Sequence, residues 1–201
     1  MSGGLLMLMS GGVDSSALAY LIKPDGLLFI DYGQRPKDGE FTAANAVAAS
    51  LGMRLDRLDV DCSTVGSGLL SGSRSIPGSP SPEWWPFRNQ LLVTLAAAWG
   101  ISRGYASIAL GLVSTDSDRH ADGSSTFVAA INRLLSVQEG SMRLVAPSLA
   151  MSTAELLARS PIPDSALAWT HSCHRAAIAC GSCPGCLKRL RVLEESGRLL
   201  G

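Results

Sequence analysis

Short apolar runs alternate with stretches of helical composition along most of the chain. Continuous apolar runs of this length are typical of strands that are buried on both faces of a sheet. We expect strands at residues 5–9, 27–31, 54–60, 107–113 and 142–146. We expect helices that reach residue 22 and span residues 41–51, 88–99 and 126–135, with Gly52 and Gly100 ending two of them. Repeated strand–helix units predict an α/β fold with a Rossmann-like parallel sheet and helices on both faces.

A chain of 201 residues favours one main domain with a small appended segment. We place an α/β domain at residues 1–165 and a C-terminal segment, packed on it, at residues 166–201. The 17 Lys and Arg residues balance the 17 Asp and Glu residues, so the chain lacks the basic excess typical of nucleic-acid binders. No apolar run approaches the roughly 18 residues of a membrane-spanning helix. The sequence therefore predicts a cytoplasmic protein without a membrane or nucleic-acid partner.

A loop rich in serine and glycine, SGGVDSS at residues 10–16, follows the first predicted strand and leads into the first predicted helix. Glycine lets the backbone approach an anion closely, and the N–H groups and dipole of a helix N-terminus favour phosphate. Asp14 would repel phosphate, so it either holds Mg²⁺ or caps the helix. The loop lacks the Gly-Lys-Ser/Thr ending of a Walker A loop and is not a GxGxxG motif. Its position nevertheless predicts a phosphate-binding site.

Four of the five cysteines fall within fourteen residues and follow the spacing C-x6-C-x2-C-x2-C. They are Cys173, Cys180, Cys183 and Cys186. In a chain without a secretory signal this spacing is typical of a metal site, and four thiolates suit one tetrahedral Zn²⁺. Short CxxC runs also hold iron–sulfur clusters, so iron is the alternative. We interpret the nearby His171 and His174 as bystanders. We interpret the basic residues that follow as a solvated helix face (Lys188, Arg189 and Arg191).

The segment from Cys62 to Pro86 interrupts the alternation of strands and helices. Of its 25 residues, 15 are Ser, Gly or Pro, a composition that resists regular structure. Trp84 and Trp85 stand near its end, and two adjacent tryptophans seldom belong to a solvated linker. We weigh two interpretations equally, a lid that closes over a ligand and a flexible insertion.

Several motifs match one family in the same order along the chain. They are SGGVDS at residues 10–15, DYGQR at 31–35, P-x-R-N at 86–89, G-x-x-x-T-D at 111–116, and the WTHSC and CGSCPGC blocks of the cysteine tail. The first resembles the PP-loop of ATP pyrophosphatases, which cleave ATP to AMP and pyrophosphate while adenylating a substrate. Together the motifs resemble the 7-cyano-7-deazaguanine synthase (QueC) family from residue 5 to about residue 191.

The resemblance implies an ATP-dependent carbon–nitrogen ligase. It would adenylate 7-carboxy-7-deazaguanine and transfer the acyl group to ammonia, giving 7-cyano-7-deazaguanine, a precursor of queuosine. The implied cofactors are ATP, Mg²⁺ and one Zn²⁺ per chain on the four clustered cysteines, and the family suggests a homodimer. The expected ATP-binding residues are Met9, Ser10, Gly11, Gly12, Val13, Asp14, Ser15 and Ser16. The expected catalytic residues are Ser10, Asp14 and Arg88. The expected substrate-binding residues are Tyr32, Gln34, Arg35, Arg88, Asn89, Asp116 and Asp122.

The chain also departs from the family pattern. Residues 117–124 keep only Asp122 of the family's F-S-G-Y-P-D-C-R block. Pro36, Ser114 and Ser152 replace a His, a Glu and a Lys of the family. Because the phosphate and metal motifs persist, we expect the acid to be recognised while the steps after adenylation change.

These departures leave three alternatives open. The first is a QueC-like enzyme that attaches deazaguanine to another amine, such as a protein N-terminus, of the kind associated with phage defence. The second is a tRNA thiolase, which would need the lone Cys62 near ATP. The third is a nucleotide sensor without catalytic activity.

Overall fold

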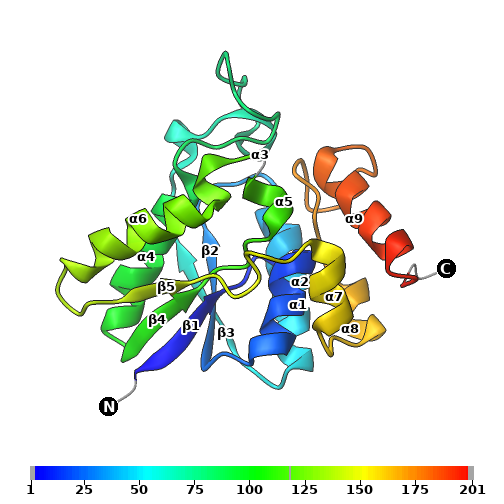
Figure 1. Cartoon of the computed structure of the whole chain (residues 1–201). Helices are drawn as coiled ribbons and strands as arrows, with labels where there is room; N and C mark the ends of the chain where they lie inside the picture. The colour runs from blue at the N-terminus through cyan, green and yellow to red at the C-terminus, as the bar shows by residue number, and fades with distance from the viewer. Residues whose placement is uncertain (1–2, 118, 199–201) are drawn as a thin grey trace.

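The computed structural model describes residues 3–117 and 119–198 of the chain. At its centre is a five-stranded sheet in the order β3-β2-β1-β4-β5, and each neighbouring pair of strands is parallel (Figure 1). The strands are β1 (Gly4–Leu8), β2 (Gly26–Asp31), β3 (Leu55–Asp59), β4 (Tyr105–Ala109) and β5 (Arg143–Val145). The predicted Rossmann-like parallel sheet is therefore confirmed.

Helices cover both faces of the sheet (Figure 1). One face carries α1 (Val13–Ile22), α2 (Lys37–Ser50), α7 (Thr153–Arg159) and α8 (Asp164–Ala168), and the other carries α4 (Arg88–Ile101) and α6 (Ser125–Ser136). The side chains of β1 alternate between the two cores, with Met7 on the α1 side and Leu6 and Leu8 on the α4 side. This period of two, with both sets of side chains buried, explains why β1 is apolar at every position.

Two predicted helix boundaries were wrong. Helix α2 begins at Lys37, four residues before the predicted start, because Asp38 and Glu40 place acidic groups in its first turn, where the helix dipole favours them. Helix α4 continues through Gly100 and ends at Ile101. A Cβ at Gly100 would lie 3.2 Å from Cδ2 of Leu6, so this glycine allows close packing of α4 on β1.

The segment from Cys62 to Pro86 is anchored at its C-terminal end. It contains one 3₁₀ turn (Ser63–Val65) and the short helix α3 (Gly68–Ser71). Trp85 is 2% exposed, and its ring meets that of Tyr32 edge-on with centroids 4.9 Å apart. Residues 72–78, in contrast, are exposed. Trp85 is therefore part of the core, and the lid interpretation stays a prediction for the exposed residues alone.

The remaining elements surround the carboxyl end of the sheet. They are α5 (Ser114–Ser117), a 3₁₀ turn (Ala121–Gly123) and α9 (Pro184–Glu195). Helix α9 packs on the α1 side of the sheet through Val192 and Leu193. The division at residue 165 stays a prediction, and α8 runs across it.

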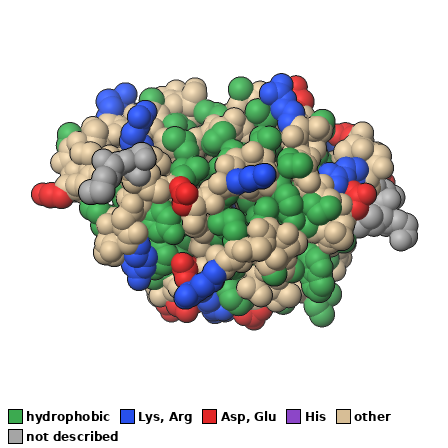
Figure 2. All heavy atoms as spheres, turned by 90° about the horizontal axis from the view of Figure 1, so that it is seen from below, with side chains coloured by type: hydrophobic (Ala, Val, Ile, Leu, Met, Phe, Trp, Pro, Cys, Tyr) green, Lys and Arg blue, Asp and Glu red, His purple; other side chains and the backbone are tan. Residues whose placement is uncertain are grey.

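Charge and hydropathy add little to the functional picture. The face in Figure 2 shows apolar side chains among singly scattered acidic and basic ones, in keeping with the formal net charge of zero. Within the described residues, no helix is both long and apolar enough to span a lipid bilayer.

Candidate active site and metal site

A cavity of about 290 Å³ lies at the carboxyl ends of the parallel strands. Residues that follow β1, β2 and β4 line it, among them Met9, Tyr32 and Gly111. The strand order reverses between β1 and β4, and open α/β sheets bind ligands at such a switch point. The cavity is therefore the place where this fold is expected to hold a substrate.

The serine- and glycine-rich loop forms one wall of this cavity. Ser10, Gly12, Val13, Asp14 and Ser15 line it together with Met9. Gly12 is the N-cap of α1, and no side chain caps the helix, so its first N–H groups face the loop without a side-chain acceptor. An open helix N-terminus of this kind favours a bound anion.

Two of the predicted ATP-binding residues of the glycine loop, Gly11 and Ser16, do not line the cavity. Gly11 has a φ of 76°, and a Cβ there would lie 2.5 Å from the carbonyl oxygen of Glu40. Only glycine therefore fits between the loop and α2. Ser16 is fully buried, and its hydroxyl has no hydrogen-bond partner among the described residues.

Asp14 faces a lysine from the far end of the chain. Nζ of Lys188 lies 3.0 Å from Oδ2 of Asp14 and 3.5 Å from Oδ1 of Asp116. Oδ1 of Asp14 is buried without a partner among the described residues. Asp14 does not cap α1, so that one of its two predicted roles was wrong, and the role of holding Mg²⁺ stays a prediction.

The predicted solvated face of α9 was wrong for two of its three basic residues. Lys188 and Arg189 both line the cavity, and only Arg191 is exposed. His171 and His174, interpreted as bystanders, line the cavity too. These positions could not be predicted, because local sequence does not show that α9 returns to the first helix.

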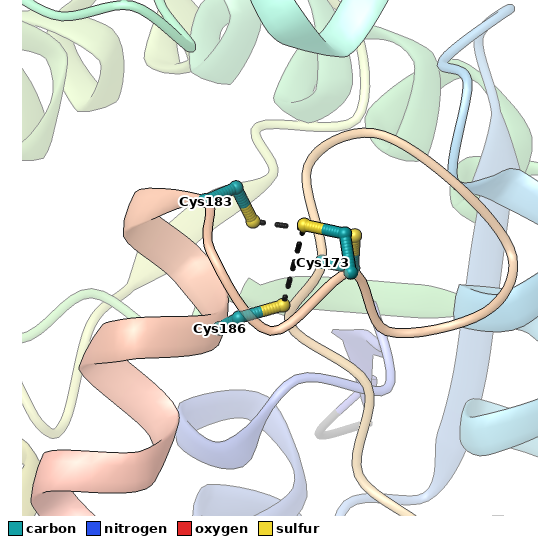
Figure 3. Close-up of side chains that lie close together, drawn as sticks. Cys173, Cys183 and Cys186 are labelled. Atoms are coloured by element: carbon teal, nitrogen blue, oxygen red, sulfur yellow. Dashed lines mark hydrogen bonds between the residues drawn. The ribbon is translucent and has the colours of Figure 1, made fainter.

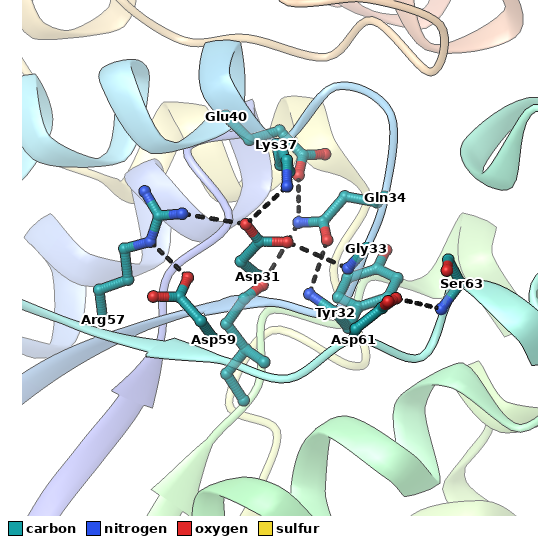
Figure 4. A network of polar contacts seen from close by, with 11 residues as sticks. Asp31, Tyr32, Gly33, Gln34, Lys37, Glu40, Arg57, Asp59, Asp61 and Ser63 are labelled. Atoms are coloured by element: carbon teal, nitrogen blue, oxygen red, sulfur yellow. Dashed lines mark hydrogen bonds and ion pairs between the residues drawn. The ribbon is translucent and has the colours of Figure 1, made fainter.

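The DYGQR block forms a hydrogen-bonded network next to the cavity (Figure 4). Oε1 of Gln34 accepts from the backbone N–H of Tyr32 at 2.8 Å, and its Nε2 donates to Oε2 of Glu40 at 2.9 Å. Burial raises the pKa of Glu40 to about 7, although the Gln34 hydrogen bond and the charge of Arg88 oppose it. Burial also raises the pKa of Tyr32 well above its ordinary value. Tyr32, Gln34 and Glu40 all line the cavity.

Other members of this block point away from the cavity. Asp31 pairs with Arg57 at 2.9 Å and with Lys37 at 3.2 Å, as Figure 4 shows. Arg35 is exposed and packs against Gly72 of the Cys62–Pro86 segment. It does not line the cavity, so the structure does not bring it to the other predicted substrate residues.

Arg88 and Asn89 begin α4 and line the cavity. Burial lowers the pKa of Arg88, but its interactions with Tyr32 and with the carboxyl groups of Asp122, Glu40 and Asp116 raise it above the ordinary value. Asp122 holds this helix start, because its Oδ2 accepts from the backbone N–H of Asn89 at 3.2 Å and its carbonyl accepts from Nδ2 of Asn89 at 2.8 Å. Asp122 lines only a small neighbouring pocket, so the structure gives it a helix-capping contact.

Four further charged or ionisable residues line the cavity and were not predicted. They are Glu40, Glu83, Arg119 and His120. Arg119 pairs with Oε1 of Glu83 at 2.8 Å, and Nε2 of His120 lies 3.9 Å from the same oxygen. Glu83 had only a weak signal in the sequence. It is a single carboxylate in a segment rich in Ser, Gly and Pro, and it stands directly before two tryptophans.

The four clustered cysteines bring their sulfur atoms together (Figure 3). All four Sγ atoms lie within 4.8 Å of one another, and two pairs are 4.0 Å apart. A tetrahedral ion with metal–sulfur bonds of about 2.3 Å would separate its ligands by about 3.8 Å. Backbone N–H groups of His174 and Arg175 point at Sγ of Cys183 and Cys173 from 3.3 and 3.4 Å. The arrangement can therefore hold one metal ion.

The cysteine segment is joined directly to the glycine loop. The backbone N–H of His171 donates to the carbonyl of Gly11 at 2.9 Å. Gly185 packs so closely that a Cβ would lie 1.8 Å from the carbonyl oxygen of Ser172. The metal site thus supports one wall of the cavity.

Comparisons with known proteins give one consistent result. The family model described as queuosine biosynthesis protein QueC matches residues 4–197. A 7-cyano-7-deazaguanine synthase of Campylobacter curvus is 33% identical over 207 residues, which cover 94% of this chain and 92% of that protein. Proteins of the same name from Chlorobaculum tepidum and Koribacter versatilis are 30% and 31% identical and cover 96% and 98% of this chain, with 92% and 91% of their own lengths matched. The match spans the glycine loop, the cavity and the cysteine cluster, and the chain belongs to the QueC family.

Proposed function

We propose that this protein is an ATP-dependent carbon–nitrogen ligase that converts 7-carboxy-7-deazaguanine into 7-cyano-7-deazaguanine with ammonia as the nitrogen donor. One observation supports it most strongly. The open N-terminus of α1 and three cationic side chains line the same cavity (Arg88, Lys188 and Arg189). This combination suits the binding of a nucleoside triphosphate and a carboxylate in one site.

The chemistry needs two activations. In the first, the substrate carboxylate attacks the α-phosphate of ATP and pyrophosphate leaves. Ammonia then attacks the acyl carbon, AMP leaves and a proton is released, which gives the amide. In the second, the amide oxygen attacks the α-phosphate of another ATP, pyrophosphate leaves, and loss of AMP together with both protons of the amide nitrogen gives the nitrile.

The residues of the glycine loop and the cationic side chains of the cavity have separate roles in this proposal. The N–H groups of the first turn of α1 and the hydroxyls of Ser10 and Ser15 bind phosphate oxygens. Arg88 and Lys188 stabilise the charge that develops as pyrophosphate leaves. Asp14, with its unpartnered buried Oδ1, fits the oxygen-donor chemistry that Mg²⁺ prefers. Bound there, Mg²⁺ would neutralise phosphate charge.

The metal on the cysteines is Zn²⁺ in a structural role. Sulfur atoms within 4.8 Å of one another leave room for a single ion, whereas an iron–sulfur cluster places iron and sulfide between the thiolates. Four protein ligands complete the tetrahedron, so the ion has no open position for chemistry. Its contribution is to hold α9 and the loop near His171 in place.

Mass spectrometry of the reaction products tests the proposal. With 7-carboxy-7-deazaguanine, ATP and ammonia, the nitrile should form together with two AMP and two pyrophosphate. Acid-dependent AMP release without amide or nitrile would favour a different amine acceptor. The absence of any acid-dependent AMP would contradict both deazaguanine activities.

One observation keeps a different acceptor as the second candidate. Arg119 and His120 belong to the block that departs from the family pattern, and both line the cavity. Because these residues stand where the family has others, the enzyme can use a different amine acceptor and still adenylate the acid. A protein N-terminus is one such amine. The thiolase alternative has no comparable support, because Cys62 does not line the cavity. The cytoplasmic location and the homodimer stay predictions.

A further inference from the structure

Glu83 presents an unpartnered carboxylate oxygen in the cavity. The residue is 5% exposed, and it comes from the Cys62–Pro86 segment rather than from the sheet. Its Oε1 is paired with Arg119 at 2.8 Å. Its Oε2 is buried and has no hydrogen-bond partner among the described residues. A buried carboxylate oxygen without a donor is costly, so its presence in a cavity points to a ligand that donates to it.

Each of the other acidic side chains of the cavity has at least one partner, although Oδ1 of Asp14 has none among the described residues. Asp14 and Asp116 share Lys188, and Glu40 accepts from Gln34. Burial raises the pKa of Glu83, but hydrogen bonds from His120 and from its own backbone N–H, together with the charges of His174 and Arg119, lower it to about 2, so Glu83 is ionised. Among the described acidic residues that line the cavity, Glu83 therefore has an unpartnered oxygen that belongs neither to the glycine loop nor to the hydrogen-bonded network around Gln34.

The surroundings of Glu83 also indicate the charge of its ligand. Arg119 already balances its negative charge. A ligand of Glu83 therefore needs no positive charge, and a neutral N–H group is enough to donate to Oε2. A guanine-like ring offers two such groups on one edge, the N1–H and the 2-amino group, and carboxylates accept hydrogen bonds from base edges.

We propose that Glu83 is the residue that selects the guanine-like ring, with Oε2 accepting from the 2-amino edge of the acid and Arg119 holding the carboxylate in position. This inference rests on the proposed function and adds a specificity-determining residue to it. Because the enzyme would lose a hydrogen bond to a charged group, it should reject an acid without the 2-amino group by roughly 10- to 100-fold.

Two acids and four variants test the assignment. The probes are 7-carboxy-7-deazaguanine and its analogue without the 2-amino group, and kcat/KM for AMP formation is measured with each. Glu83→Gln and Glu83→Asp should reduce the discrimination between the acids to less than about fivefold, mainly by slowing the acid with the amino group. Arg119→Gln should keep more of the discrimination, since it leaves Oε2 in place.

Asp164→Asn is the matched control, because Asp164 also pairs with an arginine, Arg198, at 2.6 Å, but it lies outside the cavity. It should leave both rates unchanged. Equal losses for the two acids in both Glu83 variants would overturn the inference, as would a raised KM for ammonia with unchanged discrimination. A wild-type protein that adenylates the acids without discrimination overturns the inference alone. If it adenylates neither acid, the proposed function fails as well.

Discussion

The ammonium group of Lys188 lies 3.0 Å from Oδ2 of Asp14, although 174 positions separate the two residues in the chain. Lys188 follows the last cysteine on α9, and Asp14 lies in the first turn of α1. The contact therefore joins the cysteine segment to the glycine loop. It also places a cation beside the position where we expect phosphates to bind.

Replacing Lys188 should impair ATP chemistry more than stability. Lys188→Met removes a positive charge from the cavity, and loss of one such group typically lowers a rate by about 10²–10³-fold. The measurement is pyrophosphate release with ATP and 7-carboxy-7-deazaguanine. Arg191→Met, an exposed position on the same helix, is the control and should behave as wild type. A wild-type rate for Lys188→Met would show that the cation does not act on the phosphates.

The purified protein should be colourless and contain about one zinc per chain by elemental analysis. Cys183→Ser should lose most of this zinc, because Cys183 is fully buried and, among the described residues, the group of potential metal ligands consists of the four cysteines alone. Cys62→Ser should retain it. A brown protein with labile sulfide would instead indicate an iron–sulfur cluster.

Removal of the metal should also weaken ATP binding. The cysteine segment donates a hydrogen bond from His171 to Gly11 of the loop, and this contact depends on the fold of that segment. Titration of ATP before and after treatment with a chelator measures the effect. Re-addition of Zn²⁺ should restore the affinity, and unchanged affinity in the metal-free protein would contradict the coupling.

Glu40 should make stability depend on pH near neutrality. Its pKa is raised to about 7 in the folded protein from 4.5, so between these values the folded state binds more protons than the unfolded state. The free energy of unfolding therefore falls as pH rises through this range. Relative to Glu40→Gln, the wild type should lose about 2 kcal/mol between pH 5.5 and 8. Urea unfolding of both proteins measures the difference, and parallel pH profiles would contradict it.

The Cys62–Pro86 segment should respond to ligands in only one part. Residues 72–78 are exposed, whereas Trp85 is buried against Tyr32. We expect hydrogen exchange at residues 72–78 to slow when ATP and the acid are both bound. Exchange near Trp85 should be slow already without ligands. Unchanged exchange at residues 72–78 would mean that they do not cover the site.

Local patterns in the sequence predicted much of the fold. Strands β1 and β2 lie between two helical layers, so nearly every residue in them is apolar. This gives a continuous apolar run that is recognisable in the sequence. The loop at residues 10–16 was recognisable because its chemistry depends on consecutive residues. The prediction that Gly100 ends its helix was wrong, because a glycine that ends a helix and one that allows close packing look the same in sequence.

The parts of the site that were missed come from contacts between distant segments. Lys188 was interpreted as part of a solvated helix face, and only the fold shows that it reaches Asp14. Glu83 and Arg119 are 36 positions apart and neither belongs to a recognisable motif. Asp122 was assigned to the substrate because of its place in a motif, whereas its oxygen atoms contact the start of α4. Side-chain direction and long-range pairing are not encoded in local spacing.

The hydrogen bond between His171 and Gly11 has a consequence for synthesis of the protein on the ribosome. The sheet and the glycine loop are made early, but the wall that completes the cavity includes α9. A nascent chain can therefore fold its central sheet and still lack one wall of the cavity until the cysteine segment has emerged and docked.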